Sequence, residues 1–598
     1  MKPNENEEAR PDLGKQVSKK LLNELTDAVW QMIDGLVETN CGLNRIEGHS
    51  VVVRADIDSV RDDQVAVISG SGHEPSHGGW IGPGMLSAAV AGDIFASPPA
   101  ASVLAAIMTV TGVHGCLVII KNYTGDRLHF GLACAQARAA GKKVEMVVVG
   151  EDCALPSEAD APSRRRGLAG TVLVHKVAGA AAAAGLSLEA VAAEARMAAA
   201  SVGTMGLSLS TCTLPGQTAQ QRIAHNHVEI GLGIHGEPGA RTVHLDKVDS
   251  LVDALLEQIL SDAPGHGFLS VVPGEPVCLL VNNLGATTHM ELAVAARRAI
   301  EHLEARWGVR VVRVFSGTFM SSLDMAGLSL SVMKLTTLST ARLDALTRAP
   351  AWPHASGVRI AKRAPVPAVT IVTTGESAPH GRATDPATLE RAIRCVCARL
   401  KACSAQLNEW DRLVGDGDCG DTLQAGAVAV LAALDLADTK SELADAASAL
   451  RLVGSAAERM GGSSGALYHI GLEAAVGAAV RHASGGSSDA AMWAAALAEA
   501  NRAISECGGA GVGFRTMLDA LVPASSALSA AAARGESAAQ CLDAAVTAAA
   551  EGAEATMQMR ANAGRSAFVP EAAQMGVPDP GAVGAVEWLR GIREALAE

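Results

Sequence analysis

The hydrophobic pattern of this chain changes across a proline-rich stretch at residues 348–383. Before this stretch, short aliphatic runs end abruptly in polar loops rich in glycine. After it, nearly every segment has the spacing of an alanine-rich amphipathic helix. Prolines scattered through a segment without periodic apolar residues are typical of a linker. The sequence therefore predicts two different folding units, an α/β unit followed by an all-α unit.

The first unit repeats one order of elements, in which a strand-like run is followed by a polar loop and often by a helical pattern. Its aliphatic runs lie at residues 64–68, 115–120, 143–149, 276–281 and 311–315. This order is typical of an open sheet with parallel strands, whose ligands bind beyond the carboxyl ends of the strands. We expect an α/β domain over residues 19–350, with parallel or mixed sheets in two lobes that divide near residue 200.

The second unit is expected to be helical throughout, after a linker at residues 351–383. Thr384, Asp385 and Pro386 are the residue types of a helix start. The domain then spans residues 384–598 as a bundle or barrel of helices, with its glycine-rich connections gathered at one end. Those connections lie at residues 415–420, 460–465, 508–513 and 576–581.

Charge and cysteine content argue against several classes of protein. A net charge of −14 and a pI near 5.7 disfavour a nucleic-acid-binding protein that relies on a basic surface. Twelve cysteines in 598 residues, with no C-x-x-C pair, do not suggest a disulfide framework. The polar N-terminus has no apolar signal core, and no apolar run is long enough to span a bilayer. We expect a cytoplasmic protein without nucleic-acid or membrane partners.

Three carboxylates, those of Asp411, Asp416 and Asp418, lie within eight residues and are separated by glycines. Carboxylates this close repel one another, so they usually share protons or a cation. Mg²⁺ typically combines a few carboxylates with substrate phosphates, and glycines let backbone amides approach those phosphates. An acidic surface turn, for which Asp-Gly pairs are ordinary, is the alternative. An EF-hand is a poor fit, because Ala427 occupies the twelfth position counted from Asp416.

The segment from His73 to His77 matches the H-E-x-x-H pattern of zinc proteases. That pattern requires a continuous helix, in which proline costs about 3 kcal/mol and glycine about 1 kcal/mol. Pro75 and the flanking glycines therefore predict a loop, and a metalloprotease is not expected. Two other glycine-rich loops also present an ionisable side chain, Asp126 in one and His235 in the other. For each loop alone, a plain tight turn is the alternative.

These loops lie within longer sequence motifs. The first unit contains SGHEPSHGGWIGPGML (71–86), AGDIFASP (91–98), IKNYTGDRLHFGLA (120–133), RGLAGTVLVHKVAGAAA (166–182) and LGIHGEPG (232–239). The second contains VGDGDCGDT (414–422), MGGSSGALY (460–468), RTMLDALVPA (515–524) and VPDPGA (577–582). With these motifs in this order, the chain closely resembles the single-chain, ATP-dependent dihydroxyacetone kinases over nearly its whole length.

The resemblance implies that a short ketose, dihydroxyacetone first, is phosphorylated by ATP while its ketone carbon is bound as a hemiaminal to the imidazole of His235. A neutral imidazole nitrogen can attack a small carbonyl, whereas glycerol offers none. The resemblance also implies that Asp126 is the base for the attacking hydroxyl and that His73 is catalytic. The implied substrate contacts are Gly70, Ser71, Gly72, His73, Lys121 and Asp126.

For the helical domain, the resemblance implies binding of Mg²⁺ and ATP, with Asp411, Asp416 and Asp418 as metal ligands. The implied nucleotide contacts are Asp416, Gly417, Asp418, Cys419, Thr422, Ser463, Ser464, Gly508, Thr516, Met517, Arg565, Asp579, Pro580 and Gly581. A homodimer, in which one subunit's nucleotide domain could close over its neighbour's substrate site, is implied as well.

Some positions depart from the family pattern. The glycine run usual before His73 is replaced by Ile68-Ser-Gly-Ser-Gly, which we interpret as a loop two residues shorter. Phe514 replaces the usual aspartate, and the segment starting at Arg565 reads Arg-Ser-Ala-Phe. These changes leave three alternatives open: a kinase for a four-carbon ketose such as erythrulose, a cyclising FAD-AMP lyase side activity with Mn²⁺, and a ketose-sensing module without catalysis.

Overall fold

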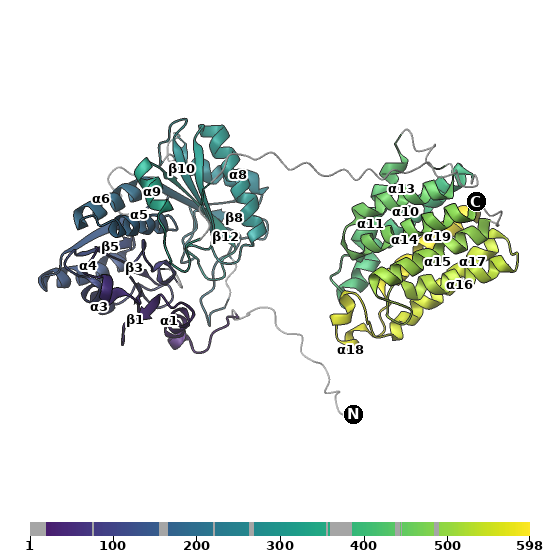
Figure 1. Ribbon diagram of the computed structural model, residues 1–598, viewed down its shortest axis with the longest axis horizontal. Coiled ribbons are helices and arrows are strands. Elements are labelled where there is room, and N and C mark those ends of the chain that lie inside the picture. The colour runs from purple at the N-terminus through teal and green to yellow at the C-terminus, as the bar shows by residue number, and fades with distance from the viewer. Residues whose placement is uncertain are drawn as a thin grey trace, which may run out of the picture. The chain divides into compact units, whose positions relative to one another are not determined.

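The computed structural model describes residues 19–73, 77–154, 165–218, 222–261, 268–353, 357–358, 385–436, 443, 445–483 and 489–597. The chain divides into two compact units, Met1–Val366 and Pro367–Glu598, each of which is described by itself (Figure 1). The linker predicted at residues 351–383 lies mostly outside the described residues.

The first lobe of the α/β unit contains a six-stranded mixed sheet in the order β1-β2-β4-β3-β5-β6. β3 is parallel to β4 and β5, and β5 is parallel to β6, whereas β2 is antiparallel to β1 and β4. The strands are β1 (Leu43–Arg45), β2 (Val51–Arg54), β3 (Ala66–Ser71), β4 (Ala88–Ala91), β5 (Cys116–Lys121) and β6 (Val144–Val149). The helices are η1 (Leu25–Asp27), α1 (Ala28–Thr39), α2 (Ile57–Val60), η2 (Gly78–Trp80), α3 (Ala100–Val110), α4 (Thr124–Ala139), α5 (Thr171–Ala183) and α6 (Leu188–Ala200).

The second lobe contains another six-stranded mixed sheet, in the order β11-β10-β12-β7-β8-β9. Only β10 and β11 are parallel, and the other neighbouring strands are antiparallel. The strands are β7 (Val202–Ser208), β8 (His227–Ile230), β9 (Arg241–His244), β10 (Pro276–Asn283), β11 (Arg310–Gly317) and β12 (Gly327–Lys334). The helices are α7 (Val248–Leu260), α8 (His289–Trp307) and α9 (Thr337–Asp344). Two mixed sheets thus confirm the predicted two-lobed α/β fold.

Helix α5 ties the two lobes together. Its residues from Thr171 to Ala182 are all buried. Most of its apolar side chains belong to one cluster that also contains Ile119 of β5 and Leu280 of β10. Small side chains permit this burial: a Cβ at Gly179 would lie 2.3 Å from the Cα of Met85. The lobes therefore share a core, so their relative position is fixed by packing.

The described part of the second unit consists of helices, as predicted. They are α10 (Pro386–Val414), α11 (Cys419–Leu434), α13 (Ala446–Ala457), η4 (Glu458–Met460), α14 (Gly462–Ala483), α15 (Asp489–Gly508), α16 (Leu518–Ala533), α17 (Ala538–Ala555), η5 (Thr556–Gln558), η6 (Arg565–Phe568), α18 (Glu571–Gln574) and α19 (Pro580–Ala597). Asp385 caps α10 by accepting a hydrogen bond from the Ala387 amide, and Pro386 occupies the first turn. Alanine and glycine let these helices pack closely, since a Cβ at Gly591 would lie 2.7 Å from the Cα of Val396.

One sequence-based expectation differs from the structure. The loop expected to carry Asp126 is the start of a helix, because α4 begins at Thr124. Asp126 therefore lies in the first turn of α4 and not in a loop. The unpaired N–H groups of this first turn favour a carboxylate.

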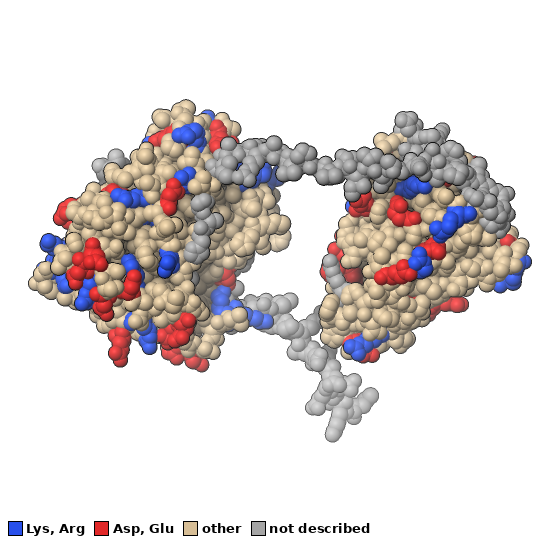
Figure 2. Space-filling view, viewed as in Figure 1, with Lys and Arg blue, Asp and Glu red and all other residues tan. Residues whose placement is uncertain are grey.

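No helix in the described ranges is both long and apolar enough to cross a bilayer. Figure 2 shows acidic and basic side chains interspersed on the visible face of each unit.

Candidate active site

Asp411, Asp416 and Asp418 lie together where α10 ends. One carboxylate oxygen from each of them falls within 4.8 Å of the other two. Asp411 belongs to the last turn of α10 and is buried, whereas Asp416 and Asp418 are exposed in the connection to α11. Three carboxylates form an oxygen donor set of the kind that Mg²⁺ binds together with phosphate oxygens. The residues present therefore fit a magnesium ion.

Asp411 also shapes the loop that carries the other two carboxylates. Its Oδ2 accepts hydrogen bonds from the amides of Gly417, Asp418 and Cys419, at 3.0, 2.9 and 3.0 Å. Gly417 adopts a φ of +84°, a conformation that glycine reaches without steric cost. The carboxylate that begins the motif thus fixes the backbone from which the third carboxylate projects.

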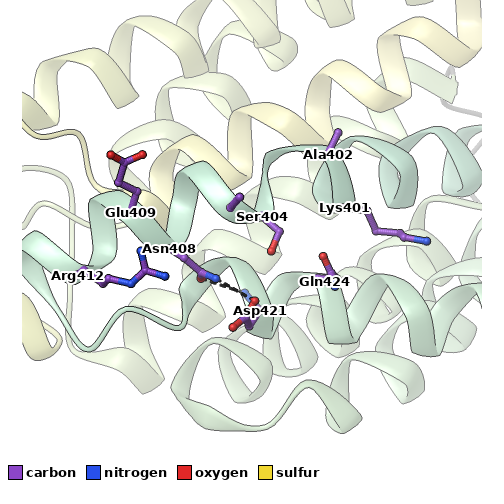
Figure 3. Close-up of a pocket in the computed structure, with 9 residues that line it drawn as sticks. Lys401, Ala402, Ser404, Asn408, Glu409, Arg412, Asp421 and Gln424 are labelled. Carbon is purple, nitrogen blue, oxygen red and sulfur yellow. Dashed lines mark hydrogen bonds between the residues drawn. The ribbon is translucent and has the colours of Figure 1, made fainter. Parts of the chain in front are cut away.

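Asn408, one turn before Asp411, holds the start of α11 in the same way. Its Oδ1 accepts from the amides of Gly420 and Asp421 at 2.7 and 3.1 Å, and its Nδ2 donates to Asp421 Oδ1 at 2.8 Å. These residues border an open groove of about 450 Å³ between α10 and α11 (Figure 3). Lys401, Ser404, Glu409, Arg412 and Gln424 also line it. The groove is mainly polar, and its described lining comes from α10 and α11, on either side of the carboxylate loop at residues 415–418.

Several predicted nucleotide contacts surround this loop. Burial raises the pKa of the Cys419 thiol to about 12, and the charges of Asp411, Asp579 and Asp418 act in the same direction. Burial likewise raises the pKa of Asp579 to about 6, although Arg515 opposes the shift. Asp579 and Asp411 therefore lie within electrostatic reach of each other. A Cβ at Gly581 would contact Asp579 Oδ1 and Met517 Cβ, which places residues 516–517 beside residues 579–581.

Four other predicted nucleotide contacts lie in the first or last turn of a helix. Thr422 lies in the first turn of α11, with its amide donating to the Asp418 carbonyl at 2.9 Å. Ser463 and Ser464 occupy the first turn of α14, and Gly508 lies at the end of α15, 3.3 Å from Leu467 when given a Cβ. The Arg565 side chain lies outside the described residues.

In the α/β unit, the structure brings His73 and His235 into direct contact. His73 follows β3, and His235 lies in the loop that follows β8. Their Nε2 atoms are 2.9 Å apart, and their ring centroids are 4.5 Å apart. His73 is 1% exposed, whereas the side chain of His235 is 25% exposed and is therefore the more accessible of the two.

Glu237 determines which nitrogen of His235 carries the proton. Its Oε1 lies 2.8 Å from His235 Nδ1, and its Oε2 accepts from the His235 amide at 3.1 Å. Burial alone would raise the pKa of Glu237, but the hydrogen bond and charge of His235 hold it at about 2. A carboxylate can only accept here, so Nδ1 donates, and in the neutral form of the ring Nε2 keeps its lone pair. Sequence analysis had not selected Glu237, although it lies in the same GIHGEPG motif.

His73 completes this proton arrangement. Burial, aided by the charges of Lys121 and His235, lowers its pKa well below the usual value. Its Nδ1 lies 3.2 Å from the carbonyl oxygen of Ser321, which can only accept. Three contacts would need three N–H groups, whereas two neutral rings supply two. The three contacts are His235 Nδ1 with Glu237, Nε2 with Nε2 between the two rings, and His73 Nδ1 with Ser321. We assign the two N–H groups of the neutral pair to the two shorter contacts, so that His73 Nε2–H donates to His235 Nε2.

Lys121 and Asp126 lie beside the histidines, at the end of β5 and the start of α4. Both are buried, and Lys121 Nζ lies 3.8 Å from Met320 Sδ. Burial raises the pKa of Asp126, while the charge of Lys121 and a hydrogen bond with Ser97 oppose the shift. A buried carboxylate with a raised pKa is suited to accept a proton from a hydroxyl group.

Gly70, Ser71 and Gly72 lie at the end of β3 and its exit, packed against the 91–98 segment. A Cβ at Gly70 would lie 2.3 Å from the Val90 carbonyl oxygen. β3 continues to Ser71, and Ile68 belongs to the buried apolar cluster of this sheet. The departure from the family's glycine run therefore lies within the strand. Residues 68–71 pair with β4 and do not form a loop, whereas the shortening by two residues relative to the family stays a prediction.

The H-E-x-x-H match does not form a zinc site in the described residues. His73 follows a strand, His77 precedes the short helix η2 with a φ of +67°, and residues 74–76 lie outside the described ranges. The ring of His77 instead lies 5.3 Å from the ring of His175. The two histidines of the motif therefore do not share a helix face.

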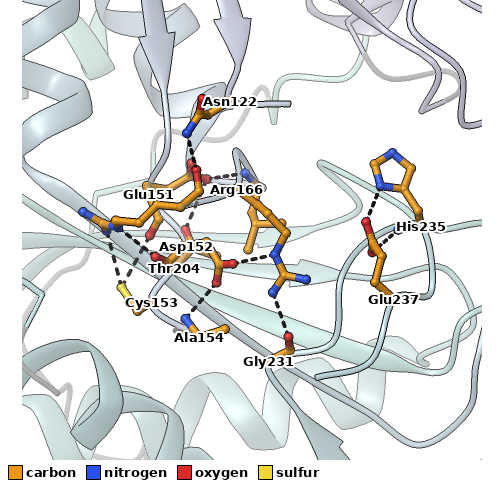
Figure 4. Close-up of polar contacts among 12 residues, drawn as sticks. Asn122, Glu151, Asp152, Cys153, Ala154, Arg166, Thr204, Gly231, His235 and Glu237 are labelled. Carbon is orange, nitrogen blue, oxygen red and sulfur yellow. Dashed lines mark hydrogen bonds and ion pairs between the residues drawn. The ribbon is translucent and has the colours of Figure 1, made fainter. Parts of the chain in front are cut away.

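A polar network supports the His235 loop from behind (Figure 4). Arg166 donates to Asp152 Oδ2 at 2.6 Å and to the Gly231 carbonyl at 2.8 Å. A Cβ at Gly233 would meet both Glu237 Oε2 and Arg166 Nη1, so a side chain there would displace one of these groups. Arg166 thereby links a buried aspartate to the loop that presents His235. The rings of Phe95 and Tyr123 contact His235, and Ser97 hydrogen-bonds with Asp126. These three residues lie in the motifs given above but were not predicted as site residues.

Comparisons with known proteins identify the family to which both units belong. Two family profiles match, the Dak1 domain over residues 34–351 and the DAK2 domain over residues 413–594. A Solanum lycopersicum protein with the provisional name 3,4-dihydroxy-2-butanone kinase is 48% identical over 97% of this chain and 98% of its own length. The triokinase/FMN cyclase of Homo sapiens is 41% identical over 97% and 99%. The crystal structure of the C. freundii dihydroxyacetone kinase with AMP-PNP and Mg²⁺ has a TM-score of 0.62 and 33% identity, over 97% of this chain and 100% of that chain.

Proposed function

Because this chain belongs to the family of dihydroxyacetone kinases that join a Dak1 and a DAK2 domain, we propose that it phosphorylates dihydroxyacetone or a similar short ketose with ATP. The observation that carries the proposal is the His73–His235 pair, in which His235 Nε2 bears a lone pair that binds a carbonyl carbon once the hydrogen bond from His73 is released. A sugar without a carbonyl has nothing to bind there. The proposed substrates are therefore small ketoses rather than polyols.

We propose that His235 Nε2 forms a bond to the ketone carbon, which converts the carbonyl into a hydroxyl. In net terms, the proton on Nδ1 is transferred to the former carbonyl oxygen. Glu237 contacts Nδ1, from which the proton leaves. The Nε2 atom of His73 lies 2.9 Å from His235 Nε2, so a polar group is also present next to the nitrogen that binds carbon. Asp126 then accepts the proton of the hydroxyl that attacks the phosphoryl group, aided by its raised pKa.

In the helical unit, Asp411, Asp416 and Asp418 would hold Mg²⁺ with the nucleotide, as their donor set allows. When bound, the ion neutralises phosphate charge and positions the transferable group. The proposed nucleotide contacts include Cys419 and Thr422, whose amides bond to Asp411 and Asp418, together with Thr516, Met517 and residues 579–581. We further propose that the enzyme works in the cytoplasm as a homodimer, which sedimentation of the purified protein would test.

The test is coupled detection of ADP release with dihydroxyacetone, glyceraldehyde, erythrulose and glycerol. ADP should appear with ketoses and not with glycerol. His235→Ala should abolish the adduct detected by mass spectrometry, and Asp126→Asn should lower turnover by roughly 10²–10⁴-fold, the usual effect of a lost general base. His244→Ala, at an exposed histidine, is the matched control. ADP release from glycerol at the ketose rate, or a His235→Ala enzyme as active as its parent, would refute the proposal.

Two further activities follow from the names of the relatives. The provisional name of the Solanum protein adds 3,4-dihydroxy-2-butanone to the same assay as a second candidate substrate. The human relative is also named an FMN cyclase, so we propose testing for cyclic FMN from FAD with Mn²⁺ and no ketose. Asp416→Asn should reduce this second activity too if both use the same carboxylates.

A further inference from the structure

Phe95 adopts a backbone conformation that bulky residues avoid. Its φ is +62°, and among the described residues it shares a positive φ with only three other non-glycine residues, His77, Leu323 and Arg515. An L-amino acid with a Cβ crowds its own carbonyl in this region, so an aromatic side chain there is uncommon. Such conformations persist only where surrounding contacts enforce them, and they concentrate at functional sites.

The contacts that enforce this conformation come from the exit of β3. The Phe95 amide donates to the Gly72 carbonyl at 2.8 Å, and the Ala96 amide donates to the Asp93 carbonyl at 2.8 Å. A Cβ at Gly72 would lie within 2.5 Å of Asp93 O and of Ala96 N. The segment that carries Phe95 is therefore pressed against the backbone that leads into His73.

The ring of Phe95 borders the gap between the two histidines. Its centroid lies 5.1 Å from that of His73 and 5.3 Å from that of His235, with an edge-on orientation to the latter. Tyr123 also meets His235 edge-on, at 4.9 Å, but has no ring contact with His73 among the described residues. A ketone bound to His235 Nε2 must enter the space next to His73, and Phe95 is the aromatic ring in contact with both.

We propose that Phe95 is a specificity-determining residue that limits the length of the ketose bound to His235. The proposal rests on the proposed function. Each arm of dihydroxyacetone contains one carbon, whereas one arm of erythrulose contains a further hydroxymethylene group. An aromatic ring cannot pair with that extra hydroxyl, and its rigid edge cannot yield as an aliphatic chain would. The positive φ fixes the ring in this position, which explains why the strained backbone is retained.

The experiment compares Phe95→Ala and Phe95→Gly with the parent enzyme, using Phe268→Ala as the control. Phe268 is a half-buried phenylalanine of the same unit that packs over Arg165, away from both histidines. For each protein, the affinities for dihydroxyacetone and erythrulose are measured without ATP, followed by kcat/KM for both with ATP. One extra carbon in a tight pocket changes kcat/KM by roughly 10–200-fold. Both Phe95 variants should therefore raise the erythrulose-to-dihydroxyacetone ratio about tenfold or more, and the control should not.

Two variants at one position separate ring size from folding. Glycine tolerates the positive φ and alanine does not, so Phe95→Gly should unfold at a higher temperature than Phe95→Ala while showing the same change in preference. An unchanged ratio of affinities in the folded glycine variant would overturn the proposal. If the parent released no ADP from any ketose, the proposed function would fail, but the binding ratio would still decide the role of Phe95.

Discussion

Several buried polar atoms of the first lobe have no hydrogen-bond partner. Among the described residues, these include Ser69 Oγ, Tyr123 Oη, Glu151 Oε2 and both ring nitrogens of His77 and His175. Each such atom costs roughly 1–3 kcal/mol relative to a satisfied one. These groups therefore lower the stability of the lobe.

The buried carboxyl group of Glu151 predicts that the free energy of unfolding depends on pH. Burial raises its pKa to about 7, against hydrogen bonds from its own backbone and Leu168. The folded protein therefore binds a proton that the unfolded chain, with a pKa near 4.5, releases. The free energy of unfolding should fall as pH rises from about 4.5 to about 7 and then level off.

The matching substitution is Glu151→Gln, which keeps the shape of the side chain without its titration. Between pH 5 and pH 8, the free energy of unfolding should fall by up to about 3 kcal/mol less in the variant than in the parent, at about 1.4 kcal/mol per pKa unit. Urea unfolding of both proteins at pH 5 and pH 8 provides the measurement, with the exposed Glu145→Gln as control. Parallel stability curves for parent and Glu151→Gln would contradict the assigned shift.

At the scale of elements, the joint between α10 and α11 is made by two side chains of α10. Asp411 and Asn408 together accept hydrogen bonds from five successive amides, those of residues 417–421. The N-terminus of α11 is thus satisfied from the neighbouring helix and not by a residue of its own sequence. The position of Asp418 depends on this joint.

Asn408→Ala should therefore weaken the joint without removing a metal ligand. Loss of a capping acceptor costs about 0.5–2 kcal/mol, and Mg–ATP affinity should fall because the carboxylate loop becomes less well ordered. Gln424→Ala, from the opposite side of the same groove, is the matched control. Thermal unfolding and calorimetry with Mg–ATP measure the two effects. Unchanged Mg–ATP affinity in Asn408→Ala would show that Asp411 alone holds the loop.

The elements that sequence analysis identified are those with long aliphatic or amphipathic patterns. β5 and β10 were predicted almost to their ends, because buried strands produce uninterrupted apolar runs. Short antiparallel strands such as β1 and β9 were not, since three or four residues show no reliable period. These strands lie at one edge of each sheet.

For the site, sequence analysis identified residues whose types imply chemistry, such as His235 and the three clustered aspartates. It did not identify residues that act through spatial neighbours. Glu237 is selected by its distance to an imidazole, Arg166 by its bond to a distant carbonyl, and Phe95 by its ring contacts. None of these relations has a signature in spacing along the chain.

At the scale of the whole molecule, the two units have separate apolar cores. The clusters of the α/β unit contain no residue beyond Trp352, and those of the helical unit begin at Leu389. The ketose pocket belongs to the first unit and the carboxylate loop to the second. Ketose binding and Mg–ATP binding should therefore respond independently to substitutions, which the full-length enzyme can test directly.

Asp416→Asn and Asp418→Asn each remove one negative charge from the proposed metal site while keeping the size of the side chain. Both should weaken Mg–ATP binding, because Mg²⁺ depends on few but charged oxygen ligands. Asp435→Asn, at an exposed carboxylate that pairs with Arg394, is the control. Dihydroxyacetone should still form its adduct at His235 with parental affinity, since neither residue shares a core with that pocket. Calorimetry with Mg–ATP and ketose titrated separately measures both. Parental Mg–ATP affinity in both variants would mean that these carboxylates are an acidic turn, and loss of the ketose adduct would show that the units do not act independently.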